Sequence, residues 1–414
     1  MKMSLTSPTM TCRCYRTINL RYLFALLLAL AALGVSGPPA WAQSQVVFSQ
    51  MTVDYTYGEQ AVFTAQVSPA ASIQHVYLFI QAAGEDTRPQ EVDFDAEGKV
   101  EFTYDLKAHP LRPFAETDYW LIAVSSDGHQ HTSPKSNFIY IDNHAPWQSL
   151  DDGRYQVNWL VGDLSFGQSA LNSTERGVTA ASKLLPGQNL AGLRVFIYDS
   201  ATRLQSVLNY NANDWAVGEA SPDLGVVLVS IPAGPDQQLE LDRQIPHEIM
   251  HVLTYKIVMQ NYKKVPMWLS EGLASLAETY PNPDYQSTLS KAAKTNSLTP
   301  MAALCTAFPQ EAADAFQAYA QSASFVQFLQ NKFGSSGLAE LVDTYKNEYS
   351  CEGGVQAATG SSLSQLDYRW RQESLGVDAG ALAIQNLSPY LIIIAILLVI
   401  PFVVAGWWYR RAHA

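Results

Sequence analysis

The stretch PHEIMH at residues 246–251 decides how the chain folds and what chemistry it can carry. It is an H-E-x-x-H motif, and residues four apart lie on one face of a helix, so His247 and His251 can direct their imidazoles to one point. Two neutral imidazoles are typical zinc ligands, and Glu248 inside the motif is then left as a general base. The motif is short, so its interpretation depends on its surroundings.

A second stretch, WLSEGLA at residues 268–274, offers the third ligand. Glu271 follows His251 by twenty residues, which is enough for a turn and an antiparallel return helix. Gly272 allows that helix to pack closely against the first. Two histidines, one glutamate and an open fourth position are typical of a catalytic zinc site. We therefore expect His247, His251 and Glu271 to bind one Zn²⁺ ion. A structural zinc usually has four protein ligands, and the sequence offers no convincing fourth.

Residues 43–145 have the pattern of an all-β domain. Alternating or continuous apolar stretches, such as those at 61–67 and 76–80, are separated by turn residues. Five to seven short strands at this spacing predict an immunoglobulin- or fibronectin-like sandwich. The stretch carries no visible chemistry, so we expect it to serve placement or contact with a partner.

Residues 146–376 predict an α+β domain that is mostly helical after the motif. Strand patterns at 194–198 and 225–231 precede the motif, and helical spacing follows it. The strand at 225–231 comes just before the motif helix, so it either borders a substrate cleft or is an ordinary core strand. Residues 377–388 then predict a linker.

Both ends of the chain carry apolar runs. Residues 1–42 combine a basic start, a Leu- and Ala-rich run and an A-x-A site, which predicts a secretory signal peptide, with an uncleaved signal anchor as the alternative. Residues 389–409 are apolar, uncharged and flanked by aromatic residues, which predicts one transmembrane helix. Two arginines mark residues 410–414 as a cytoplasmic tail. The sequence thus predicts a single-pass cell-membrane protein whose bulk lies outside the cytoplasm.

Charge and cysteine content narrow the choice of partner and compartment. The chain has 26 basic and 38 acidic residues, for a formal net charge of −12, which argues against a nucleic-acid partner. If the leader is removed, Cys305 and Cys351 are the two cysteines that remain. They form either a disulfide, as an oxidising compartment permits, or two reduced thiols.

The motif and its partner resemble the gluzincin metallopeptidases, most closely the bacterial peptidase MA-like domain, a relative of the membrane-alanyl-aminopeptidase and thermolysin groups. The resemblance rests on H-E-x-x-H at 247–251, on PMWLSEGLASLAE at 266–278 and on YAQSASFVQFL at 319–329. It covers about residues 150–375 and leaves out the predicted sandwich and both terminal segments.

The resemblance implies that the chain hydrolyses peptide bonds in peptide or protein substrates. Glu248 would take a proton from a zinc-activated water and pass it to the leaving amine. Glu278 lies near the helical face of Glu271 and would orient a ligand histidine, although a solvated carboxylate is an equal alternative.

Two departures from the family pattern qualify this expectation. Thermolysin-like enzymes use a downstream histidine for the oxyanion, and this chain has none between His251 and residue 410. A tyrosine would have to serve, and we select Tyr319 from its place in the resembling run, with Tyr262 and four other tyrosines as alternatives. The G-x-M-E-N loop that holds a free amino end in aminopeptidases is also missing, so we expect an endopeptidase.

A second hypothesis is a non-catalytic cell-surface binding protein built on a peptidase-derived domain. The intact Glu248 argues against it, because a site that has lost its activity does not need its base.

Overall fold

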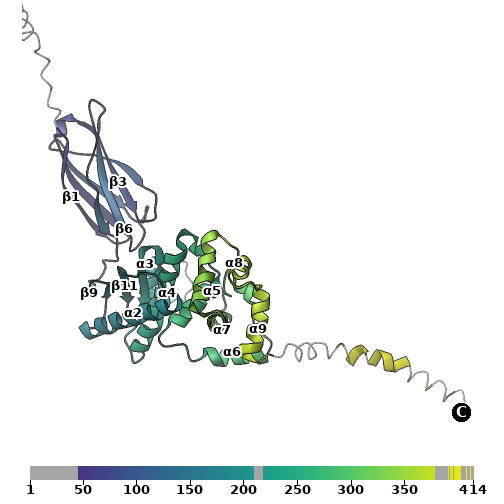
Figure 1. Ribbon diagram of the computed structural model, residues 1–414. Coiled ribbons are helices and arrows are strands. Elements are labelled where there is room, and N and C mark those ends of the chain that lie inside the picture. Colours follow the sequence, from purple (N-terminus) through teal and green to yellow (C-terminus); the bar gives the residue numbers. More distant parts are fainter. Residues whose placement is uncertain are drawn as a thin grey trace, which may run out of the picture.

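The computed structural model describes residues 45–208 and 218–377, together with isolated positions from Tyr390 onward (Figure 1). The chain begins with a β-sheet region and continues into a largely helical region, as the sequence predicts. The predicted signal peptide lies outside the described residues, and so does nearly all of the predicted linker. Figure 1 shows the β region standing on the side of the helical region where β11 and α3 lie, with α8 and α9 on the far side.

The N-terminal region is a two-sheet antiparallel sandwich. Its inner faces pack together because residues alternate along each strand, as buried Phe63 and Leu78 illustrate. One sheet has the order β1-β2-β5, and the other has the order β4-β3-β6-β7 with β8 also paired to β6. The strands are β1 (Val47–Thr56), β2 (Gln60–Ser68), β3 (Ile73–Ala82), β4 (Arg88–Val92), β5 (Lys99–Asp105), β6 (Glu116–Ser125), β7 (Gln130–Thr132) and β8 (Ser136–Ile139).

A third sheet opens the helical region, in the order β12-β13-β11-β10-β9. Strands β10, β11 and β13 run parallel, and an antiparallel strand closes each edge. Their bounds are β9 (Gln148–Asp151), β10 (Tyr155–Trp159), β11 (Leu193–Tyr198), β12 (Gly218–Ser221) and β13 (Val226–Ser230). The strand predicted at 225–231 is β13, and it is fully buried between β11 and β12. It is therefore a core strand, and β12 is the edge strand.

The sandwich and this sheet share one hydrophobic core. The Phe114 ring of the sandwich lies 4.8 Å from the Phe196 ring of β11. The buried Tyr57 hydroxyl donates a 2.7 Å hydrogen bond to the carbonyl of Val207. At the edge of the contact, the Arg112 guanidinium holds both oxygens of Asp223, at 2.6 and 2.7 Å. The sandwich is thus packed onto the sheet rather than tethered by its linking segment alone.

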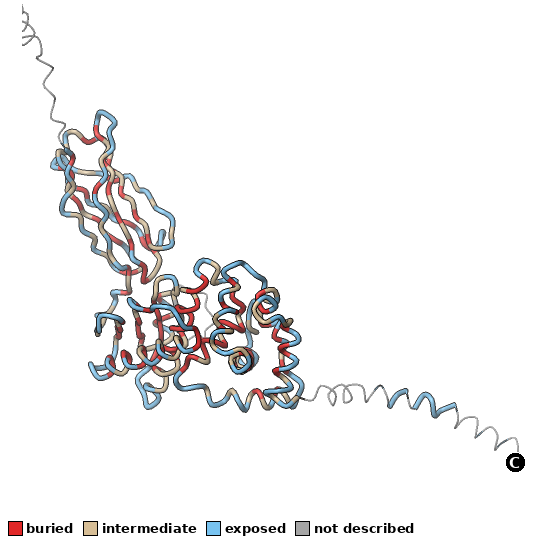
Figure 2. The backbone as a smooth tube through the Cα atoms, in the orientation of Figure 1, coloured by how far each residue is buried: buried red, intermediate tan, exposed pale blue. Residues whose placement is uncertain are grey.

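Helices carry the rest of the core, which Figure 2 shows as buried segments running through the helical region. Helix α4 packs against α2 and α5, and α5 also packs against α7. The helices are α2 (Leu164–Leu184), α3 (Ala201–Leu208), α4 (Gln237–Val258), α5 (Met267–Ala277), α6 (Tyr285–Lys294), α7 (Ala312–Thr344), α8 (Cys351–Thr359) and α9 (Leu363–Leu375). Pro246 lies inside α4, and α7 kinks at Gly334, where φ is 71°.

The transmembrane helix expected at residues 389–409 is the wrong part of the predicted fold. Among the residues that the structure describes, no helix is both long and apolar enough to cross a membrane. Several positions of the segment, and most of the predicted cytoplasmic tail, lie outside the described residues.

Candidate metal centre

Two neighbouring helices bring the three expected ligands together. Helix α4 carries His247 and His251 one turn apart, and α5 returns beside it with Glu271. One ligand atom from each of the three lies within 4.8 Å of the others. His247 Nε2 is 3.3 Å from Glu271 Oε2, and His251 Nε2 is 3.7 Å from Glu271 Oε1. The two Nε2 atoms and the carboxylate therefore converge on one point, as the spacing of the motif predicts.

The position of Glu271 depends on a close helix contact. A Cβ atom on Gly272 would lie 2.5 Å from the carbonyl oxygen of Ser322 and 2.5 Å from a methyl group of Val326, both on α7. Only glycine therefore allows α5 to pack at this depth against α7. The turn between α4 and α5 is tight, because η3 (Met259–Lys264) starts directly where α4 ends.

Glu278 fixes the orientation of His247. Its Oε1 lies 3.0 Å from His247 Nδ1, and its side chain is only 4% exposed. An ionised carboxylate can only accept, so Nδ1–H donates and Nε2 is left to face Glu271. Arg243 lies near the other side of this carboxylate, with Nε 3.9 Å from Oε2. The structure thus places Glu278 in the orienting position rather than in solvent.

His251 is oriented by two hydroxyl groups. Its Nδ1 lies 3.0 Å from the Tyr262 hydroxyl and 3.2 Å from Ser270 Oγ. Sequence reasoning missed this role for both residues, although Tyr262 was one of the candidate tyrosines. Ser270 directly precedes Glu271 on the helix that approaches the motif, which is a usable signal. No such signal places Tyr262, because its position depends on the path of η3.

Burial and charge set the ionisation of these groups. Burial alone would lower the pKa of His247, but its hydrogen bonds with Glu271 and Glu278 raise that pKa well above its usual value. Burial lowers the pKa of His251 to about 4. Burial would raise the pKa of Glu271, yet the neighbouring His251 and the hydrogen bond from His247 hold it below its usual value. The centre therefore combines the Glu271 carboxylate with a protonated His247 and a neutral His251.

Glu248 and Tyr319 lie at the same centre. Glu248 is buried on α4, and its charge acts on both His247 and Tyr319. Tyr319 comes from α7, and its hydroxyl is hydrogen-bonded to Glu271. Its ring centroid is 6.4 Å from that of His247. Burial and the Glu271 charge raise the pKa of Tyr319 far above its usual value, so the hydroxyl stays protonated. All the residues selected from the sequence thus meet at one place.

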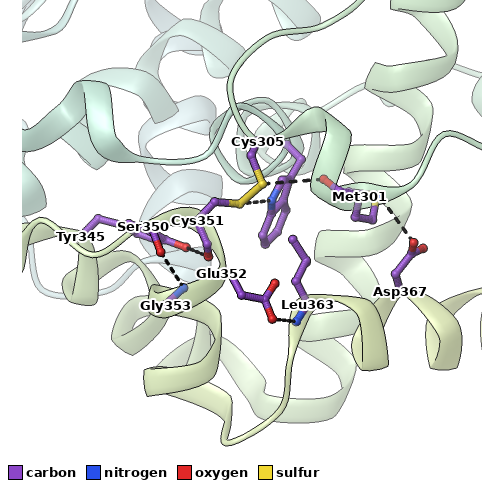
Figure 3. The surroundings of a disulfide bond; sticks show 10 residues. Met301, Cys305, Tyr345, Ser350, Cys351, Glu352, Gly353, Leu363 and Asp367 are labelled. Atoms are coloured by element: carbon purple, nitrogen blue, oxygen red, sulfur yellow. Dashed lines mark hydrogen bonds between the residues drawn. A yellow bond between two sulfur atoms is a disulfide. The ribbon is translucent and has the colours of Figure 1, made fainter.

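A cleft of about 600 Å³ opens beside the centre, and Ser270 and Glu271 form part of its wall. The disulfide between Cys305 and Cys351 forms another part, which settles the question left open by the sequence (Figure 3). The backbone N–H of Met267 at the start of α5 donates to the carbonyl of Cys305 at 2.9 Å. Through this hydrogen bond and the disulfide, the start of α5 is connected to the start of α8.

The donor set fits a zinc ion. It offers two imidazole nitrogens and one carboxylate, and in each histidine the other ring nitrogen already has a partner. That combination leaves both Nε2 atoms in the orientation a metal requires, and Glu271, the third donor, lies on the wall of the cleft.

Comparison with known proteins points to one family. Residues 175–375 match the model of the Peptidase MA superfamily, so the chain carries a peptidase MA-like domain. No curated protein matches the chain.

Among solved structures, a β-1,3-glucan binding domain of carbohydrate-binding module family 56 is 16% identical over 22% of this chain and 98% of its own, with a TM-score of 0.17. A myokine structure is 17% identical over 24% of this chain and 99% of its own, with a TM-score of 0.19. A polysaccharide deacetylase from Bacillus cereus is 11% identical over 57% of this chain and 79% of its own, with a TM-score of 0.20. Likenesses at these TM-scores carry no argument about function.

Proposed function

We propose that the peptidase MA-like domain is a zinc-dependent peptidase of the gluzincin type. One observation carries the proposal: His247, His251 and Glu271 converge within 4.8 Å while the second nitrogen of each histidine is held by another side chain. Structural zinc sites are usually closed by four protein ligands, and the described residues offer three. An open position beside a cleft is what a catalytic site needs.

The residues around the centre have distinct roles in this proposal. A bound zinc ion would polarise the scissile carbonyl and bring the pKa of a water molecule to about 7. Glu248 would serve as the general base, taking a proton from the attacking water and passing it to the leaving amine. The protonated Tyr319 hydroxyl donates a hydrogen bond to the oxygen that gains negative charge. Glu278 and Tyr262 keep the two imidazoles in place through their contacts with the outer ring nitrogens.

The substrate we propose is a peptide bond within a peptide or protein chain. The absence of a G-x-M-E-N sequence, which would hold a free amino end, supports endopeptidase over aminopeptidase action. The Cys305–Cys351 disulfide supports a location outside the cytoplasm, where disulfides persist.

Metal analysis of the full chain is the first test. We expect one zinc per chain, lost in His247→Ala and in Glu271→Ala. Glu248→Gln should retain zinc and lose peptide cleavage by at least a factor of about 10². Glu311→Gln, at an exposed carboxylate outside the centre, is the matched control and should retain both.

Zinc content that is unaffected by the ligand variants would overturn the proposed centre. If the wild type binds zinc but cleaves nothing in a broad peptide library, the non-catalytic binding protein becomes the better hypothesis.

A further inference from the structure

The cleft beside the centre has a charge pattern of its own. It is formed by η3, the start of α5 and the Cys305–Cys351 disulfide, and we call it the η3 cleft. Its charged lining residues are Lys263, Lys264 and Glu271. Glu271 is turned toward the two ligand histidines. The charge presented to a molecule inside the cleft is therefore positive.

The two lysines are adjacent in the sequence and both line the cleft. Both are exposed, and within the described part of the chain neither forms an ion pair. The chain as a whole is acidic, with a formal net charge of −12. Lys291 and Lys294 of α6 are likewise exposed and form no ion pair among the described residues. Lys263 and Lys264 differ from them in their position, on the wall of a cleft that reaches the ligand Glu271.

The remaining walls give the cleft a fixed shape. The disulfide links the residue after η4 (Met301–Leu304) to the start of α8, as Figure 3 shows. The indole N–H of Trp268 also lies 3.4 Å from Cys351 Sγ. Tyr349, which is 44% exposed, adds an aromatic surface on the same wall. A volume of about 600 Å³ accommodates a peptide side chain together with its backbone.

We propose that Lys263 and Lys264 make the η3 cleft a subsite for a carboxylate group of the peptide substrate. The inference rests on the proposed peptidase function, because it places this carboxylate next to the scissile bond. Because Glu271 borders both the metal centre and the η3 cleft, a substrate residue that flanks the scissile bond can reach this cleft, where two ammonium groups can bind its carboxylate. The carboxylate belongs to an Asp or Glu side chain or to the carboxyl end of the peptide.

Matched peptide substrates test this inference with the full chain. Internally quenched peptides of equal length carry Asp, Glu, Asn or Gln at each position flanking the cleavage site, with the carboxyl end either free or amidated. We expect Asp or Glu at one position to raise kcat/KM over Asn or Gln on the order of tenfold. A preference that is lost on amidation alone assigns the carboxylate to the carboxyl end. Because the lysines are exposed, the preference should weaken as salt is added.

Charge reversal identifies the residues responsible. Lys263→Glu with Lys264→Glu should reduce the ratio of acidic to neutral substrate to one or below, and the double glutamine variant should bring it near one. Lys291→Glu with Lys294→Glu is the matched control, since it makes the same charge change on exposed positions of α6 outside the cleft. It should retain the wild-type ratio.

A binding measurement separates this inference from the peptidase proposal. Anisotropy of the same peptides, labelled, is measured with Glu248→Gln and with that variant carrying the lysine changes. Tighter binding of acidic peptides that depends on the lysines supports the subsite even if the wild type cleaves nothing. The inference is overturned if neither binding nor cleavage favours acidic peptides, or if the lysine variants keep the preference.

Discussion

Replacement of Glu278 should weaken zinc binding in two graded steps. Its Oε1 accepts from His247 Nδ1 at 3.0 Å, and the two side chains are only 4% and 15% exposed. Hydrogen bonds to charged groups contribute about 1.5–3 kcal/mol, and neutral ones about half as much. Glu278→Gln keeps an acceptor but removes its charge, so we expect roughly a tenfold loss of zinc affinity. Glu278→Ala leaves a buried N–H without an acceptor, so we expect a loss of zinc affinity of about 100-fold.

The affinity is measured by competition with a chelator of known zinc affinity, with the unfolding free energy of the metal-free protein measured alongside. The unfolding measurement is needed because Arg243 also lies near Glu278. Replacing Glu278 removes this partner of Arg243 and lowers the stability of the protein independently of zinc. Glu340→Gln is the matched control, on an exposed position of α7. If Glu278→Ala binds zinc within threefold of the wild type, Glu278 does not orient the ligand and the reasoning is refuted.

Three further predictions concern the site and its supports. Tyr319→Phe should retain zinc and lower kcat by about 10²–10³-fold, and an unchanged kcat would exclude its hydroxyl from the oxyanion site. Replacing Cys305 and Cys351 with alanine should cost about 4 kcal/mol in denaturant unfolding, because the bond closes a loop of 46 residues; a loss below 1 kcal/mol would contradict this. The Arg112–Asp223 pair should show a coupling of about 1 kcal/mol at pH 7 in a double-mutant cycle. Because Arg112 lowers the pKa of Asp223, that coupling should persist below the usual aspartate pKa of about 4 and vanish as pH falls through the lowered value.

The parts of the centre that follow from helix geometry could be predicted from the sequence. The spacing of His247 and His251 places both imidazoles on one face, and the distance to Glu271 fits a return helix. Glu278 was expected near the helical face of Glu271, but α5 ends at Ala277 and Glu278 has a non-helical backbone, so its contact with His247 required the structure. Tyr262 could not be placed, because a 3₁₀ segment has a different periodicity and its path depends on what it packs against.

Other features depended on contacts between distant parts of the chain. The spacing of Cys305 and Cys351 leaves pairing and free thiols equally open, and only the packing of α8 beside the start of α5 decides between them. The edge position of β12 could not be predicted either. A four-residue strand gives little sequence pattern, and its neighbour β13 has the stronger apolar run. The apolar terminal run at 389–409 satisfied the criteria of length and composition for a transmembrane helix, yet the described residues form no helix that meets them.

The metal ligands could be predicted and the turn residues could not, and the reason lies in how the two ligand helices pack. A Cβ atom on Gly177 of α2 would lie 2.9 Å from the Cα atom of Pro246, just before the motif on α4. Gly272 makes the equivalent close approach between α5 and α7. At both glycines the neighbouring helix is too close for any side chain. The positions of the three ligands therefore depend on helix packing rather than on loops. Ligands on packed helices can be predicted from helical spacing. Tyr262 and the two lysines of the cleft lie in η3, so their positions could be learned only from the structure.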